Sequence, residues 1–376
     1  MSHLSILFLT TILPDEGRGQ SGGEIVTNHI VAAMRALGHD VRLLGYGRPG
    51  YQPKDGEQLV ECRPIETRVA PWCAMFWLIR ALLNGRAYSV EKFVGRAYRN
   101  ALSQVLGEKH WDYVILDHAQ MAWLLPCVQG LRLVHMSHNH ETALYLEQAG
   151  AGHLLRRLIF EREACKMDVA ERSLADCSHS VWTLTIANAE IFTALGAKTT
   201  VSLPVPPMTL PKDFCCGVPE YDIGLLGTWS WGPNRSGLDW FCNHVLPLLP
   251  KDINIALAGA GADDLQGRFS NLSVLGRIPD AAAFLGKVRC IAVPAIAGNG
   301  IQIKTLDAIA IGRPIVATGH ALRGIDSIPP RVWVADNPLD FSNALQEILS
   351  LQDEWVYDDW GTRRQEVFIA TLKEAL

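Results

Sequence analysis

Short apolar runs alternate with amphipathic segments along most of the chain. Ile6–Thr10 is a short apolar run that fits a buried parallel strand. Glu24–Leu37 places apolar residues at helical spacing, and Gly38 follows where a helix-ending glycine is expected. Val41–Gly45 is a second apolar run. The three segments predict a strand–helix–strand unit with a right-handed crossover.

The same alternation continues through the first half of the chain. Further strands are expected at Asp112–Asp117, Leu131–Ser137, Ser180–Thr185 and Thr199–Leu203. Helices are expected at residues 119–129 and over the charged segment His153–Cys177. Strands that alternate with helices in this way indicate a mostly parallel sheet with helices on both faces.

A proline-rich segment then interrupts the pattern. Pro204–Pro211 (PVPPMTLP) holds four prolines in eight residues. Proline at that density does not continue a helix or a central strand, so the segment is predicted to be a linker. After it the alternation restarts. Strands are expected at Tyr221–Gly227, Ile253–Ala258, Leu272–Leu275, Cys290–Ala295, Pro314–Ala317 and Val332–Ala335, and helices at residues 235–249, 280–288, 301–311 and 338–350.

Alternation on both sides of one linker predicts two doubly wound, Rossmann-like α/β domains. The length of 376 residues suits two domains of ordinary size. We expect an N-terminal domain over residues 1–204 and a second domain over residues 212–352. Residues 353–376 are expected to form a helix that crosses back and packs on the first domain.

Composition narrows the choice of partners and compartment. The net charge of -5 argues against nucleic acid as the main partner. Nine cysteines, an odd number without a CxxC pair, predict reduced, buried thiols in a cytoplasmic protein. Met1–Thr10 lacks the features of a signal peptide, and no apolar run is long enough to predict a membrane-spanning helix.

Ligands of doubly wound sheets bind beyond the carboxyl ends of the strands. The clearest candidate for a ligand-binding loop at such a position is Gly298–Gly300. Its glycines allow close approach of a ligand, and the first N–H groups of the following helix form an anion site. Lys304 would bring a positive charge to a diphosphate, and Asp307 would accept hydrogen bonds from ribose hydroxyls. The alternative interpretation is a plain loop followed by a solvated Lys–Asp pair.

The same segment resembles a known family. Asn299–Asp307 (NGIQIKTLD) and Ala310–Val316 (AIGRPIV) are similar to the motifs E-G-F-G-x-x-x-x-E and A-x-G-x-P-V-V of family 4 GT-B glycosyltransferases, which retain anomeric configuration. Asn299 replaces the first acid, and Asp307 shortens the second. The resemblance implies sugar transfer from a nucleoside diphosphate sugar. It places Gly298, Gly300 and Ile301 at the donor, with Asn299 and Lys304 as catalytic groups.

Two further matches lie in the second half. Tyr221–Pro250 resembles the opening strand–loop–helix of the donor domain, which implies that Gly227 faces the diphosphate. Many members carry an arginine and a lysine there, whereas this chain has Thr228 and Asn234, with Arg235 adjacent. Arg235 either substitutes for them or is an exposed helix residue. Leu275–Asp280 (LGRIPD) resembles the turn that holds the base, which places Arg277 and Ile278 beside it.

The first half supplies two more loops. Gly22 and Gly23 resemble the glycine loop that approaches the donor phosphates. His135–Glu141 (HMSHNHE) resembles the H-N-x-E signature, which implies that His138 contacts the transferred sugar and that Asn139 and Glu141 lie on the acceptor side. The spacing of the three histidines does not match a helical metal-binding pair. We therefore expect no metal and no cofactor besides the donor.

The sequence defines the acceptor less well than the donor. Pro71–Arg99 is apolar and basic, which fits either a core helix with a solvated edge or a membrane-facing surface. By resemblance, the acceptor is expected to be a glycan or a lipid-linked molecule in polysaccharide or glycolipid synthesis, with peripheral contact at the inner face of the membrane. The alternatives are a sugar-nucleotide epimerase of the same fold, a non-catalytic nucleotide-sugar-binding protein and a two-lobed solute-binding protein.

Overall fold

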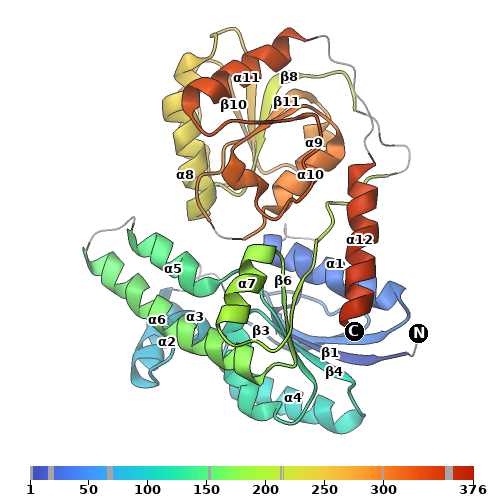
Figure 1. Cartoon of the computed structure of the whole chain (residues 1–376). Coiled ribbons are helices and arrows are strands. Elements are labelled where there is room, and N and C mark those ends of the chain that lie inside the picture. Colours follow the sequence, from blue (N-terminus) through green and yellow to red (C-terminus); the bar gives the residue numbers. More distant parts are fainter. Residues whose placement is uncertain are drawn as a thin grey trace. The chain divides into compact units, whose positions relative to one another are not determined.

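The computed structural model describes residues 3–15, 21–65, 71–150, 154–211, 214, 216–298, 300–351 and 359–376. The chain divides into two compact units (Figure 1). The first contains residues 1–203 together with 371–376, and the second contains residues 204–370. Each unit is an α/β domain built around a parallel sheet, which confirms the predicted fold class.

The described residues of the first unit form a seven-stranded sheet in the order β3-β2-β1-β4-β5-β6-β7. Its strands are β1 (Ser5–Ile12), β2 (Asp40–Gly47), β3 (Glu57–Cys62), β4 (Tyr113–Asp117), β5 (Leu133–Met136), β6 (Ser180–Thr183) and β7 (Thr200–Ser202). All neighbouring strands are parallel. The strand order reverses between β1 and β4, and a ligand site of a doubly wound sheet lies beyond the carboxyl ends at this point.

The helices of the first unit differ from the predicted ones in several places. They are α1 (Gly22–Ala36), α2 (Pro71–Leu83), α3 (Tyr88–Glu91), α4 (Arg96–Glu108), the 3-10 helix η2 (Ala119–Cys127), α5 (Glu141–Gly150), α6 (Leu154–Cys177) and α7 (Ile186–Ala194). The apolar pattern did not predict β3, α4, α5 or α7. β3 is a half-buried edge strand, so it lacks the apolar run by which buried strands are found. Pro126 lies inside η2, where it cannot donate a backbone hydrogen bond.

The described residues of the second unit form a six-stranded parallel sheet in the order β10-β9-β8-β11-β12-β13. Its strands are β8 (Tyr221–Leu226), β9 (Ile255–Ala258), β10 (Leu272–Gly276), β11 (Val288–Val293), β12 (Ile315–Ala317) and β13 (Val332–Val334). The order reverses between β8 and β11. The main helices are α8 (Gly232–Trp240), α9 (Ala281–Leu285), α10 (Ile303–Ile311) and α11 (Pro338–Ser350). The single helix predicted at residues 235–249 is instead α8 followed by a π-helical turn and a 3-10 turn that contains Pro247.

The C-terminal helix α12 (Trp360–Ala375) is divided between the two groups of residues. Arg364 Nε donates to the Val205 carbonyl at 2.8 Å, within the second unit. The Tyr113 hydroxyl donates to the carbonyl of Leu376, within the first. Only residues 371–376 of the predicted tail segment 353–376 therefore group with the first unit.

The structure decides one open alternative and corrects one prediction. The sequence left α2 open between a core helix and a surface helix, and its side chains favour the surface: Trp72 is 80% exposed and Phe76 is 56% exposed, while Trp77 is buried. Apolar side chains point to several sides of this helix. The face that carries Trp77 and Ala81 packs inward, and the other apolar side chains stay exposed. The cysteines of the described residues are free thiols, but four that were expected to be buried are exposed: Cys62, Cys127, Cys165 and Cys177. No helix among the described residues is both long and apolar enough to cross a membrane.

A buried tyrosine joins the core of the first unit to the carboxyl ends of its central strands. Tyr98 on α4 is fully buried and packs edge-on against the Trp123 ring. Its hydroxyl lies 2.6 Å from the Leu44 carbonyl and 3.0 Å from the Thr10 carbonyl, so it bridges β2 and β1. Burial raises the pKa of Tyr98 well above its ordinary value, so the hydroxyl keeps its proton and remains a donor.

We predict that Tyr98→Phe loosens the ends of β1 and β2. Losing a buried donor costs about 1–2 kcal/mol, which corresponds to roughly 5–30-fold faster opening. Hydrogen exchange of peptides that cover Ser5–Ile12 and Asp40–Gly47 should accelerate by that factor. Peptides that cover β9, in the second unit, serve as the internal control. Unchanged exchange in β1 and β2 would contradict this role.

Candidate functional site

A buried carboxylate ends the strand beside the switch point of the first unit. Asp117 is the last residue of β4 and is fully buried. Its Oδ2 accepts hydrogen bonds from the hydroxyls of Thr10 on β1, at 2.7 Å, and Thr27 on α1, at 2.9 Å. Its Oδ1 lies 2.6 Å from Nε2 of His138, which follows β5. Four segments of the unit thus meet at one carboxylate.

The environment of Asp117 keeps it ionised. Burial by itself raises the pKa of the carboxyl, but His118, His138 and the hydroxyl donors outweigh burial and hold the pKa well below its usual range. A negative charge is therefore fixed at the carboxyl edge of the sheet. The sequence pattern did not single out Asp117 or His118. The available signal was a carboxylate and a histidine directly after the apolar run of β4.

His118 adopts an unusual backbone conformation next to this carboxylate. Its φ is 72°, a left-handed value that is uncommon for a residue other than glycine. Its ring stacks on the ring of His138, with centroids 3.9 Å apart and planes at 20°. Burial, and then the neighbouring His138, lower the pKa of His118 to about 4, so this imidazole is neutral near pH 7. Strain of this kind concentrates at functional sites.

Gly22 and Gly23 were predicted in a loop, but they are the first two residues of α1. A Cβ on Gly23 would lie 3.1 Å from His118 Cε1, 3.5 Å from His118 Nε2 and 3.7 Å from His138 Nδ1. The missing side chain therefore leaves space beside both imidazoles. His138 Nδ1 is buried and has no hydrogen-bond partner among the described residues.

The predicted acceptor-side residues Asn139 and Glu141 face the interior of the unit. Glu141 begins α5 and is only 8% exposed. Its carboxyl receives hydrogen bonds from the side chains of Gln120 and Asn139. Its backbone N–H donates to Glu171 Oε1 at 2.7 Å. Burial, and then the charge of Glu171, raise the pKa of Glu141 to about 7. These contacts bury the Glu141 carboxyl within the unit, and the acceptor-side roles of Asn139 and Glu141 stay predictions.

We predict that Glu141→Gln stabilises the protein at alkaline pH. The folded-state pKa of about 7 lies above the ordinary glutamate pKa of 4.5, so the stability that Glu141 contributes is present below pH 4.5 and is lost as the pH rises through 7. Glutamine removes the ionisation, and the variant should gain about 2–3 kcal/mol over the parent at pH 8 but little at pH 5. Urea denaturation at both pH values measures the difference. An equal effect at the two pH values would exclude the ionisation as its cause.

In the second unit, the glycine loop leads into α10 as predicted. Gly298 has a φ of 99°, which glycine adopts readily. The Gly300 carbonyl accepts a hydrogen bond from Arg323 at 2.7 Å, which fixes the loop. Ile301 is half-buried, and α10 begins at Ile303 without a side-chain cap from the preceding Gln302. The Thr305 N–H donates to the Gln302 carbonyl at 2.9 Å, so the N–H groups before it are the ones that can face an anion. Asn299 lies outside the described residues.

Lys304, in the first turn of α10, is held by the other predicted donor residues. Its Nζ donates to Asn234 Oδ1 at 3.0 Å and lies 5.3 Å from the centre of the buried Trp229 ring. The Asn234 amide in turn donates to the Thr228 carbonyl at 3.0 Å. The described residues pair no carboxylate with Lys304. Burial lowers the pKa of Lys304 to about 8, because the unpaired ammonium is poorly solvated.

The sequence left two interpretations for Arg235, and the geometry favours the one in which it is a residue of the helix surface. Its guanidinium binds both oxygens of Asp264, at 2.7 and 2.6 Å, and Asp239 at 2.8 Å. The hydrogen bonds to Asp264 and Asp239 raise its pKa despite some burial. Two carboxylates thus compensate this cation on the helix surface. The prediction that it substitutes for a phosphate-binding arginine is not supported by this geometry.

The remaining predicted donor residues lie at the carboxyl ends of the second sheet. Asp307, one turn into α10, accepts a hydrogen bond from the Met208 N–H at 2.7 Å, and burial raises its pKa to about 6. Gly227 directly follows β8. Arg277 and Ile278 follow β10, the edge strand, where Arg277 is exposed and Ile278 half-buried. Their binding roles stay predictions.

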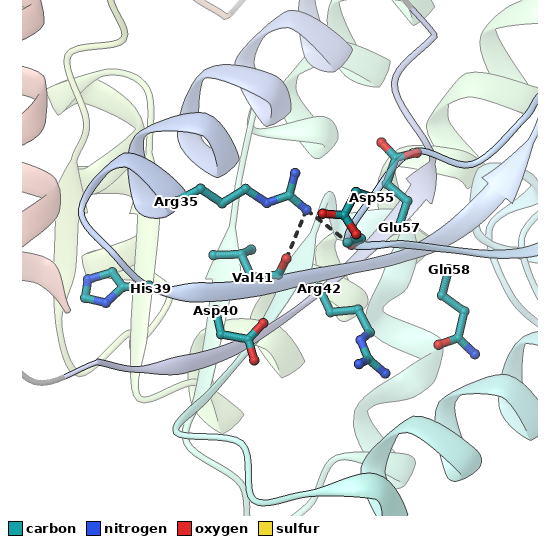
Figure 2. Close-up of a pocket in the computed structure, with 9 residues that line it drawn as sticks. Arg35, His39, Asp40, Val41, Arg42, Asp55, Glu57 and Gln58 are labelled. Carbon is teal, nitrogen blue, oxygen red and sulfur yellow. Dashed lines mark hydrogen bonds between the residues drawn. The ribbon is translucent and has the colours of Figure 1, made fainter.

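Two other features of the first unit resemble ligand sites. Asp117, His118 and His138 offer ligand atoms within 4.8 Å of one another, which suits a metal ion. The oxygens of Asp117 already accept three hydrogen bonds, so this carboxylate is satisfied without a metal ion. A surface pocket of about 660 Å³ lies at the amino end of β2, the opposite end from a ligand site in this fold. Figure 2 shows Arg35 there, bound to the carbonyls of Val41 and Gly56.

Comparison with known proteins identifies the class. The structure is similar to sucrose-phosphate synthase from Thermosynechococcus elongatus (13% identity, TM-score 0.62, 98% of this chain and 94% of that chain). It is also similar to WaaG, a glycosyltransferase involved in lipopolysaccharide biosynthesis (16%, 0.60, 98% and 94%). A third similar structure is Anabaena HepE in complex with UDP and glucose (13%, 0.53, 99% and 94%). A comparison with curated sequences gives no match.

These similarities show that the chain has the GT-B glycosyltransferase fold. Residues 220–351, which lie within the second unit, match the family described as "Glycosyl transferases group 1". The predicted resemblance to GT-B glycosyltransferases is confirmed. Membership of family 4 and retention of configuration stay predictions.

Proposed function

We propose that this protein transfers a sugar from a nucleoside diphosphate sugar to a glycan or lipid-linked acceptor with retention of configuration. The observation that carries the proposal is Lys304. It occupies the first turn of α10, directly after the Gly298–Gly300 loop, and the described residues pair no carboxylate with it. An unpaired, poorly solvated cation beside open helix N–H groups is an anion site. The group 1 family match covers this segment, which makes a diphosphate the fitting anion.

The geometry suits stabilisation of a leaving group. During transfer the bond between the anomeric carbon and the phosphate oxygen breaks, and the electron pair moves to the diphosphate. The acceptor hydroxyl oxygen bonds to the anomeric carbon, and its proton passes to the leaving diphosphate. Preorganised donors that meet this growing charge lower the barrier. Lys304 is preorganised by Asn234 and the Trp229 ring, and the α10 N–H groups add their dipole.

The similar structures support a nucleotide sugar as the donor. The HepE structure contains UDP and glucose. WaaG is named a glycosyltransferase. By the family resemblance, His138 contacts the transferred sugar and Asn299 takes part in catalysis. We propose no metal and no cofactor besides the donor, because the N–H groups of α10 and Lys304 supply the positive charge.

Lys304→Ala tests the proposal. The purified protein is incubated with UDP-glucose, UDP-galactose, UDP-N-acetylglucosamine and GDP-mannose, and release of free sugar is measured. With the donor that is turned over, the variant should lose about 10²–10³-fold in kcat, the usual cost of removing one transition-state donor. Lys287→Ala is the matched control, because Lys287 pairs with Glu220 on the surface of the same unit.

Full turnover by the Lys304 variant would contradict the assignment. Appearance of an epimerised donor instead of free sugar would indicate the sugar-nucleotide epimerase that the sequence left open.

We further propose that the first unit docks on an anionic membrane, where a lipid-linked acceptor resides. Exposed apolar side chains cover α2 and the start of α6: Trp72, Met75, Phe76, Leu78, Ile79, Leu82, Leu83, Leu154, Leu155, Leu158 and Ile159. The two segments are neighbours, since Arg162 of α6 donates to the carbonyls of Ala81 and Arg86 at 3.0 Å (Figure 1). Arg80 and Arg86 beside this surface pair with Glu91, so the exposed apolar side chains are the feature that is typical of an interfacial surface.

We predict that the double substitution Phe76→Ser and Leu155→Ser weakens binding to vesicles of phosphatidylglycerol by at least about 10-fold, because each apolar side chain contributes about 1.5–3 kcal/mol when buried. Co-sedimentation measures the binding. Leu339→Ser, at an exposed apolar position of the second unit, is the control. Equal binding by the parent and the double variant would rule out this surface.

A further inference from the structure

One segment of the second unit holds both ends of the loop that leads into α10. The segment Thr318–Arg323 follows β12. At the start of the loop, the hydroxyl of Thr318 donates to the Ala295 carbonyl. At the end of the loop, the guanidinium of Arg323 donates to the Gly300 carbonyl at 2.7 Å. Two side chains from one short segment therefore clamp the loop that precedes the proposed anion site.

Both clamping side chains are themselves held in place. Thr318 is buried, and its oxygen also accepts the Ala321 N–H at 3.2 Å, which caps the 3-10 helix η6 (Gly319–Leu322). Arg323 also donates to the His320 carbonyl of that helix. Because each side chain is bound at a second point, its rotamer is already restricted, and holding the loop costs little further side-chain entropy.

We propose that Thr318 and Arg323 are positioning residues that keep this loop in the shape that binds the donor diphosphate. The inference rests on the proposed function in taking a diphosphate as the ligand. A trans peptide carries its C=O and N–H groups on opposite sides. Since Arg323 holds the Gly300 carbonyl, the Ile301 N–H points away from the guanidinium. Among the described residues, this N–H donates to no backbone carbonyl, so it is available to a ligand.

The loop passes through a narrow space beside the guanidinium. A Cβ on Gly298 would lie 3.4 Å from Pro233 Cβ, in the first turn of α8, and 3.7 Å from Arg323 Nη2. Glycine loses more conformational freedom than any other residue when it is ordered. A loop that must be ordered on binding lowers the affinity, whereas a loop that is already ordered does not. The clamp therefore acts on donor binding, while Lys304 acts on the leaving group.

The clamp can be tested without a ligand. In full-length protein labelled with ¹⁵N-isoleucine, relaxation of the Ile301 amide gives its order parameter, and Ile301→Val assigns the signal. We expect about 0.85 in the parent and less than about 0.6 in the double variant Thr318→Val and Arg323→Met, which removes both donors and keeps the stems. Equal values in the parent and the double variant, or a parent value below about 0.6, would overturn the clamp.

The chain offers a matched control at the other end of α10. Arg331 donates to the Gly312 carbonyl at 3.2 Å, so Arg331→Met removes the same kind of bond from the end of the helix that is not proposed to bind the donor. This variant should leave the order parameter of Ile301 unchanged. An equal loss of order in Arg331→Met would show that the bonds stabilise the unit generally, which would overturn the positioning role.

Kinetics separate positioning from catalysis. With the donor identified by sugar release, the double variant should raise KM about 10-fold, because the loop must then be ordered on binding, while kcat changes less than about threefold. This pattern differs from the kcat loss expected for Lys304→Ala. Thr318→Val alone should raise KM, and Thr318→Ser, which keeps the hydroxyl, should restore it. Each single variant gives the same test if the double variant does not fold. An unchanged KM, or a loss confined to kcat, would overturn the inference.

The inference and the proposed function fail on different results. If the parent turns over no sugar nucleotide, the proposed function fails. Calorimetric titration with inorganic pyrophosphate then replaces the donor, and the double variant should bind it about 10-fold more weakly than the parent. If the parent turns over a sugar nucleotide and the double variant keeps the parent KM, only the clamp fails. The order parameter of Ile301 decides the clamp in either case.

Discussion

The buried carboxylate of Asp117 is the interaction on which the first unit depends. It sits where the strand order reverses, and its three hydrogen bonds join β1, α1, β4 and the segment after β5. An ionised carboxylate in this position is tolerable only because every one of those donors is in place. The same bonds orient a histidine and bring the first turn of α1 beside it. Fold and site therefore share one set of contacts.

In the second unit, two cations differ in how their charge is compensated. Arg235 is compensated by Asp239 and Asp264, and such a surface pair adds little binding capacity. Lys304 is instead held by an amide and an aromatic face, so its charge stays available to an anion. The two cations come from neighbouring segments beyond the sheet's carboxyl ends. What distinguishes a ligand group from a structural one is the partner, not the residue type.

The sequence predicts this fold well because parallel strands buried on both faces appear as apolar runs, as in β1 and β4. The half-buried edge strand β3 has no such run, and the apolar pattern therefore does not predict it. Loops after strands lead to the prediction of His138, Asn234 and Lys304 as site residues, and the structure places Asn234 against Lys304. Asp117 is missed because it ends an apolar run, and its partners Thr10 and Thr27 are 107 and 90 residues distant. The pairing of Arg235 with Asp264 likewise exists only after folding.

We propose above all that Lys304 and the N–H groups at the start of α10 bind the diphosphate of a sugar nucleotide. A crystal structure of the protein with the sugar nucleotide that most raises its melting temperature tests this directly. We predict a phosphate oxygen within hydrogen-bond distance of Lys304 Nζ and of the N–H groups at the start of α10. A diphosphate bound away from that helix start, with Lys304 still hydrogen-bonded only to Asn234, would contradict it.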